Sequence, residues 1–232
     1  MAASDDAVAI ALANRSYLYR LLQRVFGDEP TEALLDELFS ARAASCLQLA
    51  IEGFDENALL ACGRDAFFAD RRGFAEAAHG AYTTLFLGPH ALPAPPWESM
   101  HVAEGGSLFG SVTLDVRRRY AAYGFRPCGY PQVADDHIGI ELDFLAALAD
   151  EAQHAFEQGD RTTLDETLVC HRTFLVDHPL RWLSSFVRRL DAIERPLLYP
   201  RLARLCLLVL QSDLETIDAL RTCALSRKDL AS

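Results

Sequence analysis

Residues 138–149 read Ile-Gly-Ile-Glu-Leu-Asp-Phe-Leu-Ala-Ala-Leu-Ala, and their spacing predicts a helix. Ile138, Leu142, Leu145 and Ala149 recur every three or four positions, so they line one face of an α-helix. A β-strand would instead alternate apolar and polar residues, because successive side chains point to opposite faces of a sheet. This stretch therefore indicates a helix with one face in a core.

The same periodicity extends over most of the chain. Four further apolar faces are formed by Leu18, Leu21, Leu22 and Val25, by Phe74, Ala77, Ala78, Ala81 and Leu85, by Val116, Tyr120 and Tyr123, and by Leu183, Phe186, Val187 and Leu190. Pro179 and Pro200 are typical of a first helical turn, and Thr163 with Glu166 has the spacing of a capping box. No segment alternates as a strand would. We therefore expect an all-α fold, a compact bundle of roughly ten helices.

Two interruptions divide this pattern. The first, residues 88–112, is rich in proline and glycine and cannot be one continuous helix. The second begins at Gly124 and carries further prolines and a glycine between residues 127 and 131, which is typical of a hinge. We therefore predict an N-terminal helical half over residues 1–126 and a C-terminal half over residues 127–232. A monomer and a dimer that exchanges halves at the hinge are both open.

The first interruption carries residues suited to binding a peptide. It contains Pro95-Pro96-Trp97-Glu98-Ser99, and a tryptophan after two prolines has little conformational entropy left to lose on binding. Glu98 would meet a basic side chain, and Ser99 would bond a peptide backbone. The alternative is that Trp97 packs back onto the core, as most buried aromatic residues do.

A second cluster stands where the helix of residues 138–149 begins. Asp135 and Asp136 precede it, and either carboxylate would cap its free N–H groups. His137 and Glu141 lie four residues apart and so share one helix face. Such an acidic pocket would bind an arginine or a lysine through charge-assisted hydrogen bonds. It would equally be half of a metal site, or a helix cap beside a surface histidine.

Composition restricts the class of partner. The net charge of −11 repels nucleic acid and anionic lipid and attracts basic peptides. The six cysteines form no Cys-x-x-Cys pair, which favours reduced thiols in a cytoplasm. The N-terminus has no basic signal-peptide region, and no apolar run approaches the ~20 residues that cross a bilayer. We therefore expect a cytoplasmic protein with no nucleic-acid partner and no stable membrane insertion.

Catalytic signatures are absent from the chain. It has no phosphate-binding glycine loop, no Gly-x-Ser-x-Gly and no His-Glu-x-x-His, and Lys228 is its only lysine. We therefore expect no enzymatic activity and no bound metal. Two alternatives stay open: a metal-dependent hydrolase that uses Asp135, Asp136 and His137 with His101 or His178, and a non-catalytic structural subunit.

Four segments, taken together, resemble a known family. They are Tyr82-x-x-Leu85-Phe86 with Gly88-Pro89, then Pro96-Trp97-Glu98-Ser99, then Thr113 to Tyr120 leading to Gly124, and finally Asp136-His137-Ile138 with Glu141-Leu142 and Phe144-Leu145. Their order and spacing are similar to those of the TorD/DmsD family of redox-enzyme maturation chaperones, which is related to NarJ. The resemblance extends from about Tyr17 to Leu210. In the last segment Asp135 stands where the family often has proline, which adds negative charge.

The resemblance implies an all-helical cytoplasmic chaperone of the Tat pathway. Such a protein binds the twin-arginine signal peptide of a molybdopterin-containing oxidoreductase, and also its apo form, and assists assembly before export. Guanine nucleotide is associated with some members, although this chain shows no nucleotide motif and we expect no cofactor. We predict that the peptide-binding residues are Tyr82, Leu85, Phe86, Pro96, Trp97, Glu98, Ser99, Asp135, Asp136, His137 and Glu141.

Overall fold

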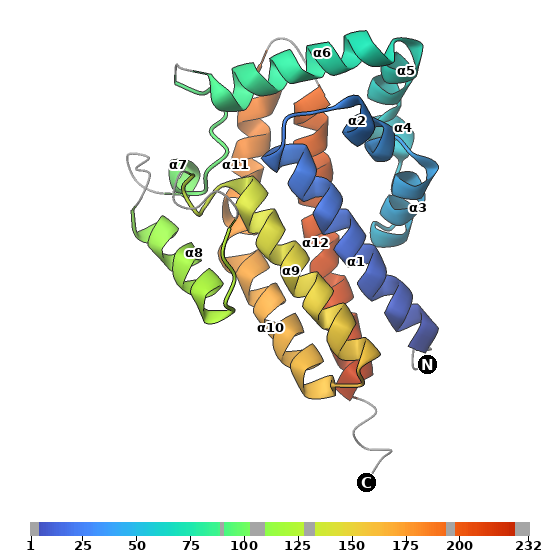
Figure 1. Ribbon diagram of the computed structural model, residues 1–232, viewed down its shortest axis with the longest axis vertical. Coiled ribbons are helices and arrows are strands. Elements are labelled where there is room, and N and C mark those ends of the chain that lie inside the picture. The colour runs from blue at the N-terminus through green and yellow to red at the C-terminus, as the bar shows by residue number, and fades with distance from the viewer. Residues whose placement is uncertain (1–4, 89–90, 103–109, 128–132, 194–197, 226–232) are drawn as a thin grey trace.

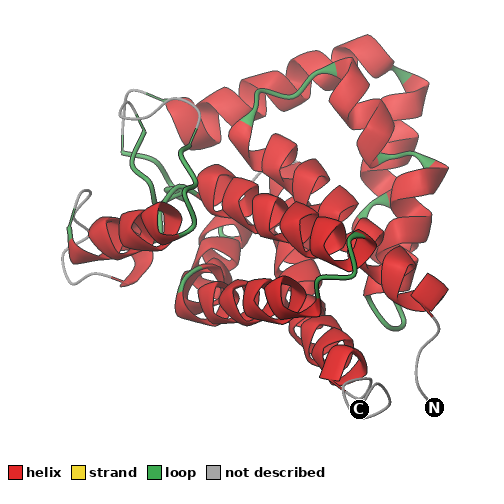
Figure 2. Cartoon of the chain, turned by 60° about the horizontal axis from the view of Figure 1, so that its bottom comes forward, coloured by secondary structure: helices red, strands yellow, loops and turns green. Residues whose placement is uncertain are grey.

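The computed structural model describes residues 5–88, 91–102, 110–127, 133–193 and 198–225. These residues form helices joined by loops, and Figure 2 shows no strand among them. The predicted all-α fold is therefore confirmed. Most of the predicted hinge, residues 128–132, lies outside the described part, as do Lys228 and the middle of the loop of residues 88–112. The division into two halves and the exchanged dimer stay predictions.

The helices follow one another along the chain, and the longest segments between them precede α7 and α9. They are α1 (Asp5–Gly27), α2 (Glu32–Leu38), α3 (Ala41–Ala50), α4 (Glu56–Leu59), α5 (Ala61–Ala69), α6 (Arg71–Tyr82), a π-helix η1 (Thr83–Leu87), α7 (Ser99–Val102), α8 (Ser111–Ala122), α9 (Ile138–Glu157), α10 (Arg161–Asp177), α11 (Pro179–Asp191) and α12 (Leu198–Leu225).

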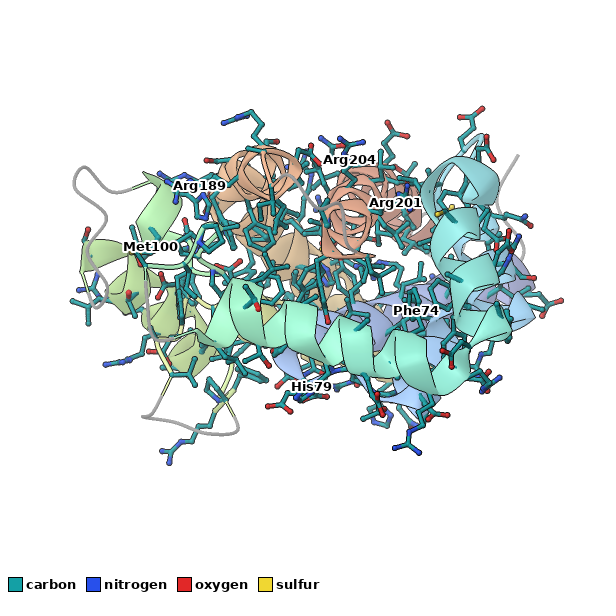
Figure 3. The ribbon with its side chains drawn as sticks, turned by 90° about the horizontal axis from the view of Figure 1, so that it is seen from above. Phe74, His79, Met100, Arg189, Arg201 and Arg204 are labelled. Atoms are coloured by element: carbon teal, nitrogen blue, oxygen red, sulfur yellow. The ribbon has the colours of Figure 1, made fainter. Side chains whose placement is uncertain are left out.

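Four long helices, α1, α9, α10 and α12, make up the centre of the molecule (Figure 1). α1 packs most extensively on α9, while α10 packs on both α9 and α12. α6 crosses one end of this bundle, as the view from above shows (Figure 3). Helices α2 to α5 lie along one side, and α8 lies on the other (Figure 1). None of the described helices combines the length and the apolar run that a bilayer crossing requires.

The crossing of α1 and α9 depends on two glycines. A Cβ atom built on Gly139 would lie 2.7 Å from the Cα of Gly27 and 3.1 Å from its amide nitrogen. Real Cβ atoms do not approach a backbone so closely, so position 139 requires glycine. The end of α1 therefore meets the beginning of α9 directly, and this contact places the two helix ends beside the proline-rich loop.

Several local predictions were wrong, and one of them is that Ala77 lines an apolar face, since the structure leaves it exposed. α10 begins at Arg161, where the Asp160 carboxylate caps the helix by accepting from the Thr163 amide at 3.0 Å, so Thr163 is not the cap. Tyr123, assigned to an apolar face, is 39% exposed because it lies at the C-cap of α8, where the helix ends. Pro179, in contrast, begins α11 as predicted.

A buried ion pair joins α1 to α12. Arg15 donates from Nε to Asp213 Oδ1 at 2.6 Å and from Nη2 to Asp213 Oδ2 at 3.1 Å. The Tyr19 hydroxyl donates to the same carboxylate at 2.6 Å, and Arg15 Nη2 also bonds His171 Nδ1 at 3.1 Å. Burial raises the pKa of Asp213, but Arg15 and His171 outweigh it and hold that pKa below its ordinary value. His171, which is fully buried, thus takes part in the network around this ion pair.

Replacing Asp213 with Asn should lower the free energy of unfolding by about 3 kcal/mol, because it leaves the buried Arg15 guanidinium without its counter-charge. Urea denaturation measures this change. The matched control is Asp218→Asn on the same helix, since Asp218 is 53% exposed in its pair with Arg172. The control should cost less than about 1 kcal/mol, and equal costs for the two variants would contradict the role given to burial.

Candidate functional site

Two segments with predicted site residues are joined through their backbones. The Glu98 amide donates to the Asp136 carbonyl, and the Ile138 amide donates to the Pro96 carbonyl, each at 2.9 Å. Trp97 and His137 stand opposite each other in this short antiparallel pairing. The loop before α7 is therefore fixed to the beginning of α9, although 40 positions separate Trp97 from His137 in the chain.

The Asp136 carboxylate holds three segments together. It accepts from the Ser99 amide at 2.9 Å through one oxygen and from the Thr113 hydroxyl at 2.9 Å through the other. Asp136 is fully buried, so no solvent competes for these bonds. The carboxylate therefore links the beginnings of α7, α8 and α9. These beginnings lie in three of the four segments that carry the family resemblance, and the shared bonds give a physical reason why those segments occur together.

The prediction that Asp135 or Asp136 caps α9 was wrong. His137 is the N-cap, and its Nδ1 accepts from the Gly139 amide at 3.0 Å. Asp135 instead binds Arg117 of α8, whose Nε and Nη2 lie 2.7 and 2.6 Å from its carboxylate. The carboxylates turn away from α9 because they bond the loop and α8.

Glu98 and Glu141 are buried near each other between α7, α9 and α11. The Glu98 carboxylate accepts from His178 Nδ1 at 2.9 Å and lies 3.7 Å from Arg181 Nη1. Glu141 accepts from Trp182 Nε1 at 3.2 Å. Burial, together with the neighbouring Glu98 carboxylate, raises the pKa of Glu141 well above its ordinary value. Through these bonds to His178 and Trp182, the two buried glutamates attach the beginning of α7 and α9 to α11.

Contacts on the outside of α7 add to this attachment. Arg189 Nη2 of α11 donates to the Met100 carbonyl at 3.3 Å, and Figure 3 shows the two residues on the same side of the molecule. His101 Nε2 donates to the Pro95 carbonyl at 2.8 Å, and its ring stacks on Trp182 with centroids 4.9 Å apart. The short helix α7 is thus held by α11 on two sides.

The remaining predicted residues lie at the end of α6 and in the π-helix. Tyr82 donates from its hydroxyl to the Phe26 carbonyl at 3.2 Å. Leu85 and Phe86 are buried, and the Phe86 ring packs edge-on against Tyr82 with ring centroids 5.2 Å apart. Leu87, the last residue of the π-helix, is 54% exposed. The wider turn of this segment thus turns Phe86 inward and leaves Leu87 outside.

These elements enclose a cavity of about 480 Å³. Four of the predicted residues line it: Tyr82, Phe86, Trp97 and His137. The other seven lie outside its wall: Leu85, Pro96, Glu98, Ser99, Asp135, Asp136 and Glu141. The remainder of the wall comes from Gln23, Gly27, Asp28, Leu87, Gly88, Leu92, Pro127, Val133, Gly139, Ile140 and Asp143. We call this space the loop cavity.

Trp97, in the wall of the loop cavity, has a hydrogen-bond donor without a partner in the described part of the chain. The side chain is half-buried, and its ring meets the His137 ring edge-on at 5.4 Å between centroids. Its Nε1 is buried and has no partner among the described residues. The alternative that Trp97 packs onto the protein is met in part, because its ring contacts His137. Its role as an anchor for a peptide stays a prediction.

Sequence reasoning missed two carboxylates of the loop cavity. Asp28 follows α1 and is exposed, and Asp143 lies on α9, where it accepts from Arg20 at 2.8 Å. No described cation lies within ion-pair distance of Asp28. Neither residue belongs to a motif, so only the meeting of α1 with α9 places them here.

The residues of the hydrolase alternative do not converge. Asp135, Asp136 and His137 bond three different segments, and His101 and His178 bond Pro95 and Glu98. Within the described ranges, no three histidine, cysteine, aspartate or glutamate side chains are grouped as a metal site requires.

Replacing Asp136 with Ala should lower the free energy of unfolding by about 3 kcal/mol, since it leaves the Ser99 amide and the Thr113 hydroxyl without acceptors in a buried place. Hydrogen exchange of the Ser99 amide should become faster. Thr113→Val removes only one of the two bonds and is the control, with slow exchange retained at Ser99. Unchanged exchange in Asp136→Ala would contradict the assigned link.

The free energy of unfolding should decrease as the pH falls, because His137 stays neutral in the folded protein. Burial lowers its pKa to about 4, against a smaller opposing effect of Asp136. Between pH 6.5 and 4 the unfolded chain binds a proton that the folded chain does not, so stability decreases as the pH falls. From pH 7 to pH 5 the loss from this residue is about 2 kcal/mol.

The variant His137→Asn keeps an acceptor for the Gly139 amide but does not titrate, so its stability should fall less over the same range. Urea denaturation at pH 7 and pH 5 measures the difference. His171, whose pKa burial lowers to about 3, contributes equally to both proteins. Identical losses in the variant and the wild type would show that His137 binds protons equally well in the folded and unfolded chains.

Known proteins share these segments. A family model described as nitrate reductase delta subunit matches residues 46–188. The probable Tat proofreading chaperone DmsD of Haemophilus influenzae is 28% identical over 193 residues, which cover 83% of this chain and 86% of that protein. The chaperone protein TorD of Vibrio cholerae is 32% identical over 139 residues, 60% of this chain and 61% of that protein.

A solved structure of a candidate redox enzyme maturation protein from Archaeoglobus fulgidus also matches, with a TM-score of 0.45 and 23% identity over 87% of this chain and 93% of that one. The family match spans more than half of the 232 residues and contains the loop, α8 and the beginning of α9. This chain therefore belongs to the nitrate reductase delta subunit family, and the resemblance to TorD and DmsD in its motifs is confirmed.

Proposed function

We propose that this protein is a cytoplasmic chaperone that binds the twin-arginine signal peptide of a molybdopterin-containing oxidoreductase and assists its assembly before export. The family match and the names of its relatives support a chaperone of redox-enzyme maturation. The observation that carries the peptide-binding role is the loop cavity, whose wall combines apolar side chains with carboxylates and with Trp97, a residue whose Nε1 has no partner among the described residues.

The apolar part of the signal peptide would occupy the loop cavity. Phe86, Leu92 and Ile140 supply apolar walls, and the exposed Leu87 and Val133 extend them outward. An extended peptide presents free carbonyl groups, and one of them would accept the unpartnered Trp97 Nε1–H. Burial of apolar side chains would provide most of the affinity.

The arginines would meet carboxylates at the edge of the same cavity. Asp28 is exposed and pairs with no described cation, while Asp143 is only partly neutralised by the exposed Arg20. Guanidinium groups form charge-assisted, often bidentate bonds with such carboxylates. We therefore place the arginine contacts at Asp28 and Asp143.

The acidic residues predicted from sequence would act on binding mainly through the shape of the site. Asp136 and Glu141 are fully buried, and Asp135 is paired with Arg117. Reaching any of them would require a peptide to break existing bonds in a low-dielectric interior, which costs several kcal/mol. Their effect on affinity would come through Trp97 and His137, which they hold in place.

A free signal peptide is disordered, so binding must offset the cost of ordering it, and moderate affinity follows. Calorimetric titration with the twin-arginine signal peptide of a molybdoenzyme from the same genome tests the proposal. An ordinary secretory signal peptide, which lacks the paired arginines, is the control. Binding of the first peptide only is the expected result, and equal binding of both would remove the arginine contacts from the proposal.

Two surface variants test the placement. Leu87→Ser should weaken the binding of the twin-arginine peptide about tenfold through lost apolar contact, and Asp28→Asn about fivefold through a lost charged bond. Both residues are exposed, so folding should be unaffected. Leu114→Ser, at a residue 45% exposed on α8, is the matched control. Unchanged affinity in both variants would place the peptide elsewhere on the protein.

A further inference from the structure

A second cavity lies toward the other end of α1 and has a volume of about 410 Å³. Its wall is formed by the N-terminal half of α1, the end of α3 and the C-terminal half of α12. Ala11, in this wall, lies 16 residues before Gly27 of the loop cavity, about 24 Å along a helix. We call this space the α1–α12 cavity.

Exposed apolar residues gather at the two cavities. Among the large apolar side chains that the structure describes, Ile10, Leu49, Phe68 and Leu87 are more than half exposed. Ile10 and Leu49 both line the α1–α12 cavity, and Leu87 lines the loop cavity. Leaving such side chains in water is unfavourable, and their grouping around a concave apolar surface marks a binding site.

Two buried polar groups in the wall of the α1–α12 cavity lack partners. Arg15 is 4% exposed, and its Nη1 has no hydrogen-bond partner among the described residues. Asn14 is 8% exposed and donates from Nδ2 to the Cys46 carbonyl at 3.0 Å, which fixes the orientation of its amide and leaves Oδ1 without a partner. Buried polar groups are nearly always bonded, so this donor and this acceptor point to a ligand.

The charge of the wall selects the kind of ligand. Asp213 already neutralises Arg15 through two bonds, so a carboxylate or phosphate would find no net positive charge there. Asn14 Oδ1 would also repel an anion, since both are acceptors. An extended polypeptide backbone is neutral, and each of its residues presents a carbonyl acceptor and an amide donor on the same side of the chain, which matches Arg15 Nη1 and Asn14 Oδ1.

We propose that the α1–α12 cavity binds an aliphatic segment of a second polypeptide chain. Its side chains lie against Ile10 and Leu49. One of its extended residues accepts from Arg15 Nη1 through its carbonyl and donates to Asn14 Oδ1 through its amide. This site is separate from the loop cavity and requires no arginine in the ligand. The inference does not depend on the proposed signal-peptide site, and either one can fail without the other.

The soluble peptide acetyl-Gly-Leu-Leu-Gly-amide is the probe. Titration followed by backbone amide NMR should perturb signals of α1, α3 and α12 around the cavity. Cys223, a half-buried free thiol in the wall, should react with iodoacetamide about threefold more slowly when the peptide is bound, as mass spectrometry of the modified site can measure.

Matched ligands separate peptide recognition from general apolar binding. The same peptide methylated on all four of its backbone nitrogens lacks the N–H donors of its residues and should bind about fivefold more weakly. Octanoate carries a similar aliphatic surface with an anionic end and should not compete. Preferred binding of octanoate, or equal binding of the methylated peptide, would overturn the proposal, as would the absence of any shift around the cavity.

Two protein variants locate the site. Ala11→Trp fills the cavity and should abolish the NMR shifts, and Leu49→Ser, at a position 60% exposed, should weaken binding about fivefold without risk to folding. Leu114→Ser, on α8 and away from the cavity, should leave binding unchanged. Full affinity in both cavity variants would show that the peptide binds elsewhere and would overturn the proposal.

Discussion

The arrangement of the site depends on the buried carboxylate of Asp136. The loop before α7 has few backbone bonds of its own, so its polar groups need partners from elsewhere in the fold. Asp136 accepts from the Ser99 amide and the Thr113 hydroxyl, and its carbonyl accepts from Glu98. These bonds bring Trp97 against His137 and so form one wall of the loop cavity. They also add to the contacts that hold α7 and α8 beside α9, among them the pair between Arg117 and Asp135.

Charged groups inside the bundle serve to select one arrangement of helices. The Arg15–Asp213 pair joins α1 to α12, and Glu98 with His178 joins α7 to α11. The free energy needed to remove two charges from water is about as large as the free energy gained from their attraction. Their main effect is therefore to favour one arrangement of the helices over others. A shift of either helix would leave a charge unpaired in the interior, which is more costly than a poorly packed apolar contact.

The two cavities differ in electrostatic character, although both have apolar walls. Carboxylates without full compensation border the loop cavity, in a protein whose net charge is already −11. The α1–α12 cavity has a neutral wall, because Arg15 and Asp213 cancel. The first therefore suits a basic peptide with an apolar part, and the second suits an uncharged aliphatic segment. A chaperone with both would contact an unfolded client at two separate places.

The sequence by itself determined the helical class, the proline-rich loop and the two segments that bring Trp97 and His137 to the loop cavity. Periodicity is local, so Leu142 and Leu145 reveal a helix without any knowledge of its partners, and several prolines and glycines within one short stretch exclude a continuous helix there. Only the tertiary structure decided which side chains face a ligand. Asp136 looked like a helix cap and proved to bond Ser99 and Thr113, while Asp28, part of no motif, came to the edge of the loop cavity. The physical reason is that these contacts arise from helix packing, above all the close approach of Gly27 and Gly139, between residues too far apart in the chain for any local pattern to relate them.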